Sequence, residues 1–205
     1  MRIGLMGGTF DPPHIGHVLP VESAAAEFSL DRVLFIPAYI PPHKQRPDLT
    51  DPYHRFAMLA IALQRYPNFL ISSWELMKGT VSFTVDTVEQ FLQGPCAQDQ
   101  LFFLMGADSF LEFHTWHQYE KLIRLCRFII INRGTNRVEL QDNLEKLEKN
   151  LQLDLSKTVY FAGSPELPVS SSEIRSAIAA GDSVSSLLAP EVDAYIRKHS
   201  LYKRR

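Results

Sequence analysis

The chain has 205 residues, of which 45% are hydrophobic and 21% are charged, and its formal net charge is −2. This hydrophobic fraction is enough to build a buried core. The near balance of charge leaves no broad basic surface, which argues against a general nucleic-acid-binding role. The apolar runs are far shorter than a membrane span, and residues 1–3 lead into a strand-like segment without the apolar core of a signal peptide. We therefore expect a cytoplasmic protein without a membrane partner.

Cys96 and Cys126, the only cysteines, are too few for a disulfide framework or a zinc site, and we expect both thiols to be buried.

Short apolar runs of strand length alternate along the chain with segments of helical periodicity. The expected strands are 2–6, 32–37, 69–73, 101–105, 128–132 and 159–162; the expected helices are 15–28, 53–64, 85–92 and a leucine stripe over 140–151, with a proline-rich loop at 38–51. The tail over 170–202 is predicted to be helical apart from a break near Gly181 and Pro190. This alternation predicts an α/β fold, a Rossmann-like doubly wound parallel sheet with a small C-terminal helical segment. Ligands of such sheets bind beyond the carboxyl ends of the strands.

The segment 7–17, GGTFDPPHIGH, follows the first expected strand and carries the most informative pattern in the chain. Its two adjacent glycines allow a sharp turn and a close approach of a ligand to the backbone. His14 and His17 fall about one helical turn apart at the start of the next helix, so both rings can point the same way, and Gly16 between them leaves room for a phosphate. A helix N-terminus itself offers N–H donors to an anion. The segment therefore suits phosphoryl-type transfer, which depends on positioning and charge neutralisation.

Other interpretations of this segment fit less well. The two histidines lack the neighbours that would complete a tetrahedral ligand set, so we expect no metal bound by the protein alone. The glycines do not form the G-x-G-x-x-G pattern of dehydrogenases. The G-x-x-x-x-G-K-[ST] motif of P-loop ATPases does not occur in the chain.

Three further positions suggest ligand contacts. Ser170 followed by Glu173 predicts a capping box at a helix start, which would form a second anion site with Arg175 as a two-pronged phosphate contact; a capped surface helix with an ordinary arginine is the alternative. Asp108 follows a central strand, where it can accept hydrogen bonds from a ribose or cap a helix. Trp116 offers a flat stacking surface to an electron-poor ring.

The His14–His17 quartet fits the H-x-G-H signature of a nucleotidyltransferase superfamily, and GGTFDPPHIGH resembles the bacterial nicotinate-nucleotide adenylyltransferases within it. The resemblance continues through IPPHK (40–44), SFTVDT (82–87), GADS (106–109), the Trp116 region, residues 133–134, SSSEIR (170–175) and the ending SLY (200–202). It implies a single nucleotidyltransferase domain over 1–205, with a C-terminal helical part from about 170 to 205. The implied reaction transfers AMP from ATP to nicotinate mononucleotide, giving nicotinate adenine dinucleotide and pyrophosphate in NAD biosynthesis.

The same resemblance implies roles for individual residues. His14, His17 and Arg175 would be catalytic. The ATP-binding residues would be Gly7, Gly8, Thr9, Phe10, Gly106, Asp108, Ser171 and Ser172, and those binding the mononucleotide would be Lys44, Thr84, Trp116 and Arg133. For Lys44 and Arg133 a solvated surface position is the alternative. The partners would be ATP and nicotinate mononucleotide, and Mg²⁺ would be held mainly by ATP oxygens. A homo-oligomer is possible.

The chain departs from the family pattern mainly on the side of the acceptor. Ala38-Tyr39 stands where Asn is common, Lys78 where Arg is usual, Val81 where Pro is usual, and Phe83 and His117 where Tyr is usual. These departures leave both nicotinate and nicotinamide mononucleotide open as the acceptor. A phosphopantetheine acceptor and a regulatory nucleotide-binding module without catalysis are the remaining alternatives. The Trp116 region and SSSEIR argue against the first, and the retained histidines and Arg175 argue against the second.

Overall fold

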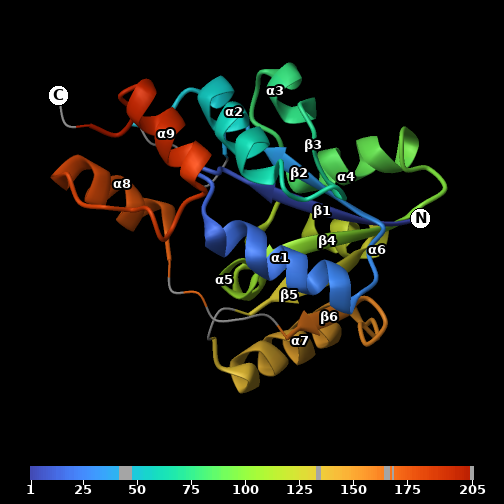
Figure 1. Cartoon of the computed structure of the whole chain (residues 1–205). Coiled ribbons are helices and arrows are strands. Elements are labelled where there is room, and N and C mark those ends of the chain that lie inside the picture. Colours follow the sequence, from blue (N-terminus) through green and yellow to red (C-terminus); the bar gives the residue numbers. More distant parts are fainter. Residues whose placement is uncertain (42–47, 133–134, 164–166, 168, 204–205) are drawn as a thin grey trace.

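The structure is a computed structural model that describes residues 1–41, 48–132, 135–163, 167 and 169–203. Its centre is a six-stranded parallel sheet with the strand order β3-β2-β1-β4-β5-β6 (Figure 1). The strands are β1 (Arg2–Gly8), β2 (Arg32–Pro37), β3 (Phe69–Ile71), β4 (Gln100–Gly106), β5 (Arg127–Ile131) and β6 (Val159–Ala162). The expected doubly wound α/β fold is confirmed.

Helices connect the strands and cover both faces of the sheet. They are α1 (Ile15–Glu27), α2 (Pro52–Leu63), α3 (Trp74–Lys78), α4 (Thr84–Gln93), α5 (Ala107–Leu111), the 3-10 helix η1 (Phe113–Thr115), α6 (Tyr119–Leu125), α7 (Arg137–Leu151), α8 (Ser171–Ala180) and α9 (Pro190–Lys198). In the part of the chain that the structure describes, no helix is long and apolar enough to cross a membrane.

The sheet separates two hydrophobic cores because successive side chains of a strand point to opposite faces. In β4, Leu101, Phe103 and Met105 pack with α4, α5, α6 and α7. Phe102 and Leu104 of the same strand pack on the other face, with α1 and α2. Because both faces are covered, the strands are almost continuously apolar, which explains why the sequence pattern predicts them.

The direction of winding reverses between β1 and β4. The chain proceeds from β1 to β3 on one side and then returns to place β4 on the other side of β1. The connections leaving these two neighbouring strands therefore diverge at their carboxyl ends, which is where ligands bind in open sheets of this topology. Residues 9–14 follow β1 at this point, and Ala107 follows β4.

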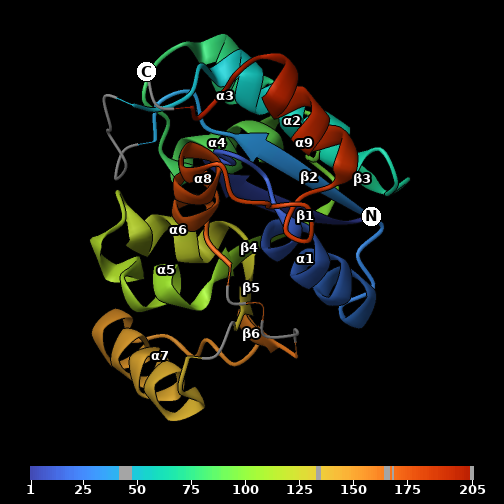
Figure 2. The same ribbon diagram turned by 60° about the vertical axis from the view of Figure 1, so that its left-hand side comes forward.

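The C-terminal helices α8 and α9 form a third core with α2. The apolar side chains in it are Met58 from α2 and Ile174, Val184, Leu188, Val192 and Ile196 from the C-terminal segment. Both ribbon views show α9 beside α2, at the end of the sheet where α1 begins (Figures 1 and 2). This docking brings the end of the chain next to the segment that follows β1.

Four short elements differ from the sequence-based expectation. The prediction did not include α3, α5, η1 or α6, which have only three to seven residues each. Helices this short contain too few turns to show a periodic apolar stripe. The first strand is also longer than the predicted range 2–6, because β1 continues through Gly7 and Gly8.

Candidate active site

The sharp turn after β1 is made by Phe10, not by the adjacent glycines. Gly7 and Gly8 pair with β2 as part of the strand, whereas Phe10 has a φ of 50°, in the left-handed region. Gly8 is needed for another reason, because a Cβ there would lie 2.8 Å from the Phe10 ring. The Phe10 side chain is buried and packs edge-on against the His17 ring at a centroid distance of 5.2 Å. Its ring therefore supports His17, and only the backbone of Phe10 is placed to meet a ligand.

The paired histidines stand side by side at the start of α1, as expected. Their ring centroids are 3.8 Å apart and the rings are tilted by 35°. The backbone N–H of His14 donates to Nδ1 of His17 at 3.3 Å. Since that nitrogen accepts, Nε2 carries the proton of the neutral His17 ring and is its donor. His14 is only 3% exposed and His17 is half-buried, so His17 is the more accessible of the two.

Gly16 does not leave open room beside the helix. A Cβ at this position would lie 2.7 Å from Cγ1 of Val169 and 3.1 Å from the His14 ring. The expectation of space for a phosphate next to Gly16 is therefore wrong. The glycine instead allows the chain preceding α8 and the His14 ring to approach the first turn of α1.

The C-terminal segment holds the loop 9–14 through several hydrogen bonds. The hydroxyl of Ser171 donates to the carbonyl of Pro12 at 3.0 Å, and Nη1 of Arg175 donates to the carbonyl of Asp11 at 2.8 Å. The hydroxyl of Tyr202 donates to Oδ1 of Asp11 at 2.7 Å. At the helix start, the N–H of Ile15 donates to the carbonyl of Leu187 at 3.0 Å. Two of the predicted site residues, Ser171 and Arg175, thus contact the histidine loop directly.

Arg55 of α2 also holds this loop, through hydrogen bonds from a buried guanidinium. Its fully buried guanidinium donates to the carbonyls of Thr9, Tyr39 and Thr50 at 2.8 to 2.9 Å. Burial lowers the pKa of Arg55, and the nearby carboxylate of Asp11 opposes that effect. A single cation therefore joins three separate chain segments around the start of the site.

The start of α8 has the predicted capping box. The Ser170 hydroxyl accepts from the N–H of Glu173 at 3.2 Å, and the Glu173 carboxylate accepts from the N–H of Ser170 at 3.0 Å. One helical turn further on, Nη2 of Arg175 donates to the Ser172 hydroxyl at 3.1 Å. The guanidinium therefore bridges α8 and the histidine loop.

Gly106 and Asp108 lie at the carboxyl end of β4. A Cβ at Gly106 would meet no described atom within 4 Å, so the backbone is approachable there. Gly106 is the N-cap of α5, and Asp108 is an exposed residue within the helix. The alternative in which Asp108 caps a helix is therefore wrong, and Asp108 lies just beyond the carboxyl end of β4.

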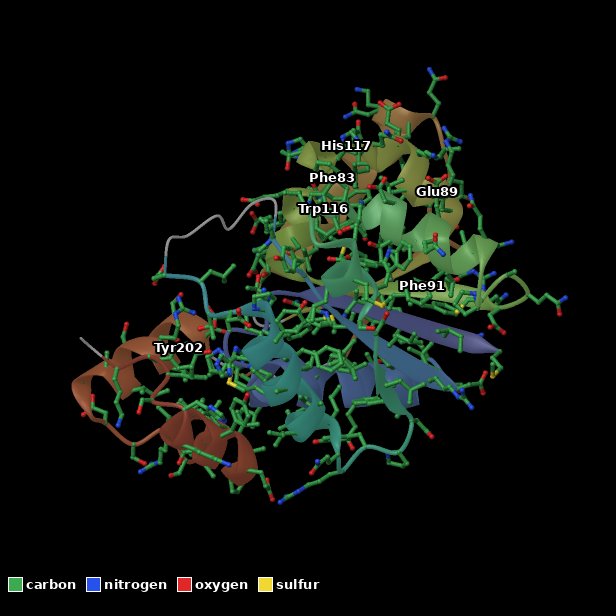
Figure 3. The ribbon with its side chains drawn as sticks, turned by 90° about the horizontal axis from the view of Figure 1, so that it is seen from above. Phe83, Glu89, Phe91, Trp116, His117 and Tyr202 are labelled. Carbon is green, nitrogen blue, oxygen red and sulfur yellow. The ribbon has the colours of Figure 1, made fainter. Side chains whose placement is uncertain are left out.

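The aromatic side chains of Phe83, Trp116 and His117 form a second part of the candidate site, which we call its aromatic half. Phe83 precedes α4 and its ring lies 4.3 Å from the His117 ring, centroid to centroid. The neighbouring Trp116 packs edge-on against Phe103 at 6.0 Å and is half-buried. Figure 3 shows Phe83, Trp116 and His117 gathered together, apart from Tyr202. The structure thus pairs two positions, 83 and 117, that both depart from the family pattern.

Several other predictions concern single residues. Thr84 is the first residue of α4, directly beside Phe83. Lys44 and Arg133 lie outside the described residues. Cys96 and Cys126 are buried as expected, and burial raises the pKa of Cys126 to about 12. Among the described residues, no three His, Cys, Asp or Glu side chains cluster as a metal site would require.

Sequence reasoning missed Asp11, Arg55 and Tyr202 as parts of this site. Arg55 carried a usable signal, since it shares a four-residue spacing with Leu59 and Leu63 and so falls on the buried face of its helix. A charged residue on such a face needs partners, which marks it for attention. The bond between Asp11 and Tyr202 spans 191 residues and leaves no trace in local spacing.

Comparison with known proteins identifies the class that this fold and site define. Residues 5–177 match the cytidylyltransferase-like family, and the chain belongs to it. Within that class it is 37% identical over 205 residues to a probable nicotinate-nucleotide adenylyltransferase of Thermoanaerobacter sp., covering 100% of this chain and 95% of the relative. It is 36% identical to the nicotinate-nucleotide adenylyltransferase of Bacillus subtilis, covering 98% of both chains. The chain is a member of the nicotinate-nucleotide adenylyltransferase family, as the H-x-G-H resemblance predicted.

Solved structures support the fold independently. The nicotinic acid mononucleotide adenylyltransferase of Plasmodium falciparum, complexed with APC, superposes with a TM-score of 0.78 at 21% identity, over 98% of this chain and 96% of that one. Its complex with NaAD gives a TM-score of 0.77 at 24% identity, over 98% and 97%. At this level of identity the match concerns the fold alone.

Proposed function

We propose that the protein transfers the adenylyl group of ATP to nicotinate mononucleotide, with His14 and His17 at the reacting phosphorus. The observation that carries this assignment is the imidazole pair, with ring centroids 3.8 Å apart, at the first turn of α1. This turn lies beyond the carboxyl end of β1, next to β4, where nucleotides bind in sheets of this topology. Relatives sharing more than 35% identity over nearly the full chain are named for this activity.

The reaction is a direct displacement at the α-phosphorus. An oxygen of the acceptor phosphate attacks that phosphorus, the bond to the bridging oxygen of the β-phosphate breaks, and pyrophosphate leaves with the electron pair. No side chain needs to act as a nucleophile. The protein holds the two substrates in line and neutralises the charge that develops on the α-phosphate oxygens.

The two histidines and the helix start serve the α-phosphate. The imidazole donors of His14 and His17 stabilise its oxygens, and the start of α1 adds a favourable dipole. Backbone groups of Gly7, Gly8, Thr9 and Phe10 lie beside the triphosphate, and Gly106 and Asp108 contact the nucleoside. The position of these residues at the carboxyl ends of β1 and β4 supports the proposed roles.

The start of α8 serves the leaving group. Ser171, Ser172 and Arg175 bind the β- and γ-phosphates. Arg175 bonds to Asp11 and Ser172 in this structure, and its guanidinium would also contact phosphate. A guanidinium presents five donors in a fixed fork, which allows it to bridge the loop and a phosphate simultaneously.

Nucleotidyltransferases of this kind use a divalent metal ion together with ATP. The described residues offer no cluster of three metal-binding side chains. We propose Mg²⁺ for this role, in which it would neutralise phosphate charge and supply no redox chemistry.

On the acceptor side, the proposed contacts are Thr84 and Trp116, together with Lys44 and Arg133. Trp116 would stack on the pyridine ring, and the first backbone N–H groups of α4, beginning at Thr84, would face the ring substituent. A carboxylate suits this helix start better than a carboxamide does, since the helix dipole favours negative charge there. This preference supports nicotinate over nicotinamide mononucleotide as the acceptor.

The test is an assay of the purified protein with ATP, Mg²⁺ and either mononucleotide. We expect equal amounts of dinucleotide and pyrophosphate, formed faster with nicotinate mononucleotide. Parallel reactions with phosphopantetheine monitor the alternative acceptor by pyrophosphate release. The proposal fails if neither mononucleotide yields a dinucleotide, or if pyrophosphate appears only with phosphopantetheine.

A further inference from the structure

The carboxylate of Asp11 lies at the centre of the histidine loop and is almost completely buried, with 1% of its surface exposed. It stands three residues before His14. Its Oδ1 accepts the hydroxyl hydrogen of Tyr202 at 2.7 Å, and its backbone carbonyl accepts from Arg175 at 2.8 Å. A buried carboxylate is stable only when its oxygens are well hydrogen-bonded. The conformation of the loop therefore depends on the groups that bond to Asp11.

Tyr202 reaches this carboxylate from a turn at the end of the chain. The residue has a φ of 63°, an uncommon conformation for a tyrosine, and its ring packs with the third core beside Met58. The hydroxyl also lies 4.0 Å from the Met58 sulfur. Burial and the charge of Asp11 both raise the pKa of Tyr202, so the hydroxyl keeps its proton and remains a donor. The packing of the C-terminal segment thus holds this hydroxyl close to the buried carboxylate.

The other hydrogen bonds described between the C-terminal segment and the loop involve main-chain atoms of the loop and of the first residue of α1. Ser171 and Arg175 donate to carbonyl oxygens of the loop, and Leu187 accepts from the first N–H of α1. Tyr202 is different because it bonds to a loop side chain, and that side chain belongs to the turn between Phe10 and the histidines. A shift of Asp11 would therefore move the start of α1 relative to β1.

We propose that Tyr202 is a positioning residue for adenylyl transfer, which holds Asp11 and thereby fixes the loop that aims His14 and His17 at the α-phosphate. The inference rests on the function proposed above. It assigns the end of the chain a part in catalysis although Tyr202 itself touches neither substrate. In-line transfer is sensitive to alignment, and an error of about 1 Å can lower a rate by about 100-fold.

The variant Tyr202→Phe removes one hydroxyl and keeps the ring in the third core. We expect kcat to fall about tenfold, with the KM for ATP and for the mononucleotide changed less than about threefold, because alignment and not binding is lost. The matched control is Tyr195→Phe. Tyr195 lies on α9, in the same C-terminal segment, and its hydroxyl bonds to Nδ1 of His54 at 2.9 Å. The control also loses one tyrosine hydrogen bond to another element, but none to the loop, so its kcat should remain within about twofold of the original.

A double-mutant cycle with Asp11→Ala distinguishes positioning from general stability. If Tyr202 acts through Asp11, adding Tyr202→Phe to Asp11→Ala should lower kcat by less than about twofold more, since the shared interaction is already gone. All variants are assayed well below their melting temperatures, which are measured separately. The inference is overturned if Tyr202→Phe leaves kcat unchanged or if both tyrosine variants lose the same activity. It is also overturned if the fold-losses in kcat of Tyr202→Phe and Asp11→Ala multiply in the double variant. An unsubstituted protein without activity would instead refute the proposed function.

Discussion

The two halves of the candidate site are stabilised by different kinds of interaction. The histidine loop is held by directed hydrogen bonds from α2 and the C-terminal segment, including those from Arg55 and Tyr202. The aromatic half is held by ring packing, in which Phe83 contacts His117 and Trp116 contacts Phe103. Hydrogen bonds constrain distance and direction, whereas apolar packing tolerates exchange of similar shapes. Two of the departures from the family pattern, Phe83 and His117, lie in the aromatic half, whereas Tyr39 adjoins the hydrogen-bonded half through its bond with Arg55.

The same contrast separates two kinds of functional effect. A change in the hydrogen-bonded half should alter the rate of the chemical step or the stability of the loop. A change in the aromatic half should alter the affinity and choice of the acceptor. This assignment would be contradicted if substitutions in the aromatic half altered the chemical step, or if substitutions in the hydrogen-bonded half altered the choice of acceptor.

The largest effect is expected for His17→Ala. Removing one preorganised donor to a transition-state oxygen typically lowers kcat by about 100- to 1000-fold, and the KM for the acceptor should change little. His17 is half-buried and bonds to the N–H of His14, so the fold should survive its loss. The measurement is steady-state kinetics with a melting curve. His114→Ala, at an exposed histidine of η1, is the control and should retain activity. Near-normal turnover of the His17 variant would remove the histidine from the mechanism.

The next largest effect concerns stability and comes from Arg55→Met. Methionine keeps much of the apolar stem but leaves the carbonyls of Thr9, Tyr39 and Thr50 without their donor. Since each unsatisfied buried acceptor costs about 1–3 kcal/mol, we expect the free energy of unfolding to fall by about 3 kcal/mol in urea titrations.

Arg65→Met provides the matched control for Arg55. Arg65 lies just beyond the end of α2 and is exposed, with a surface ion pair to Glu191 at 2.9 Å. Exposed pairs contribute at most about 1 kcal/mol. Equal losses in the two variants would show that the buried guanidinium does not stabilise the loop.

A smaller effect is expected for Trp116→Leu in the aromatic half. Aromatic stacking contributes about 0.5–1.5 kcal/mol beyond the burial of area, so the KM for the mononucleotide should rise about three- to tenfold. The KM for ATP should stay constant, because this side chain is proposed to contact only the acceptor. Trp74→Leu, at the half-buried tryptophan of α3, is the control. A rise in the KM for ATP in the Trp116 variant would contradict the division between the two halves.

The sequence predicts much of this molecule, and the failures have physical causes. The pattern of apolar runs predicts all six strands, which in β4 and β5 reflects burial on both faces, and a local pattern predicts the cap at Ser170. The adjacent glycines predict a turn at Gly7 and Gly8, but the packing of the Phe10 ring against Gly8 places the left-handed residue at position 10. Local propensity favours glycine there, and tertiary packing overrides it. Contacts such as that between Asp11 and Tyr202 arise only when the third core brings the chain end to the loop.

The smallest predicted effect concerns the contribution to stability of the contact between α3 and α4, next to the aromatic half. Glu75 of α3 is buried and accepts the hydroxyl hydrogen of Thr87 of α4 at 2.7 Å. Burial raises the pKa of Glu75, and the Thr87 bond opposes that shift only in part. The folded protein therefore holds the Glu75 proton to higher pH than the unfolded chain does. As the pH rises from about 4.3, the usual value for glutamate, to the folded pKa, this residue makes the protein progressively less stable.

Glu75→Gln should remove that part of the pH dependence. The amide oxygen can still accept from Thr87, and no charge develops in the buried position. We expect the variant to be as stable as the original protein near pH 4 and more stable at pH 7, by no more than about 1 kcal/mol. The measurement is the free energy of unfolding between pH 4 and 7, with Glu112→Gln, at an exposed glutamate, as the control. A stability curve for Glu75→Gln parallel to that of the original would show that the carboxyl group does not weaken the packing of α3 on α4 at neutral pH.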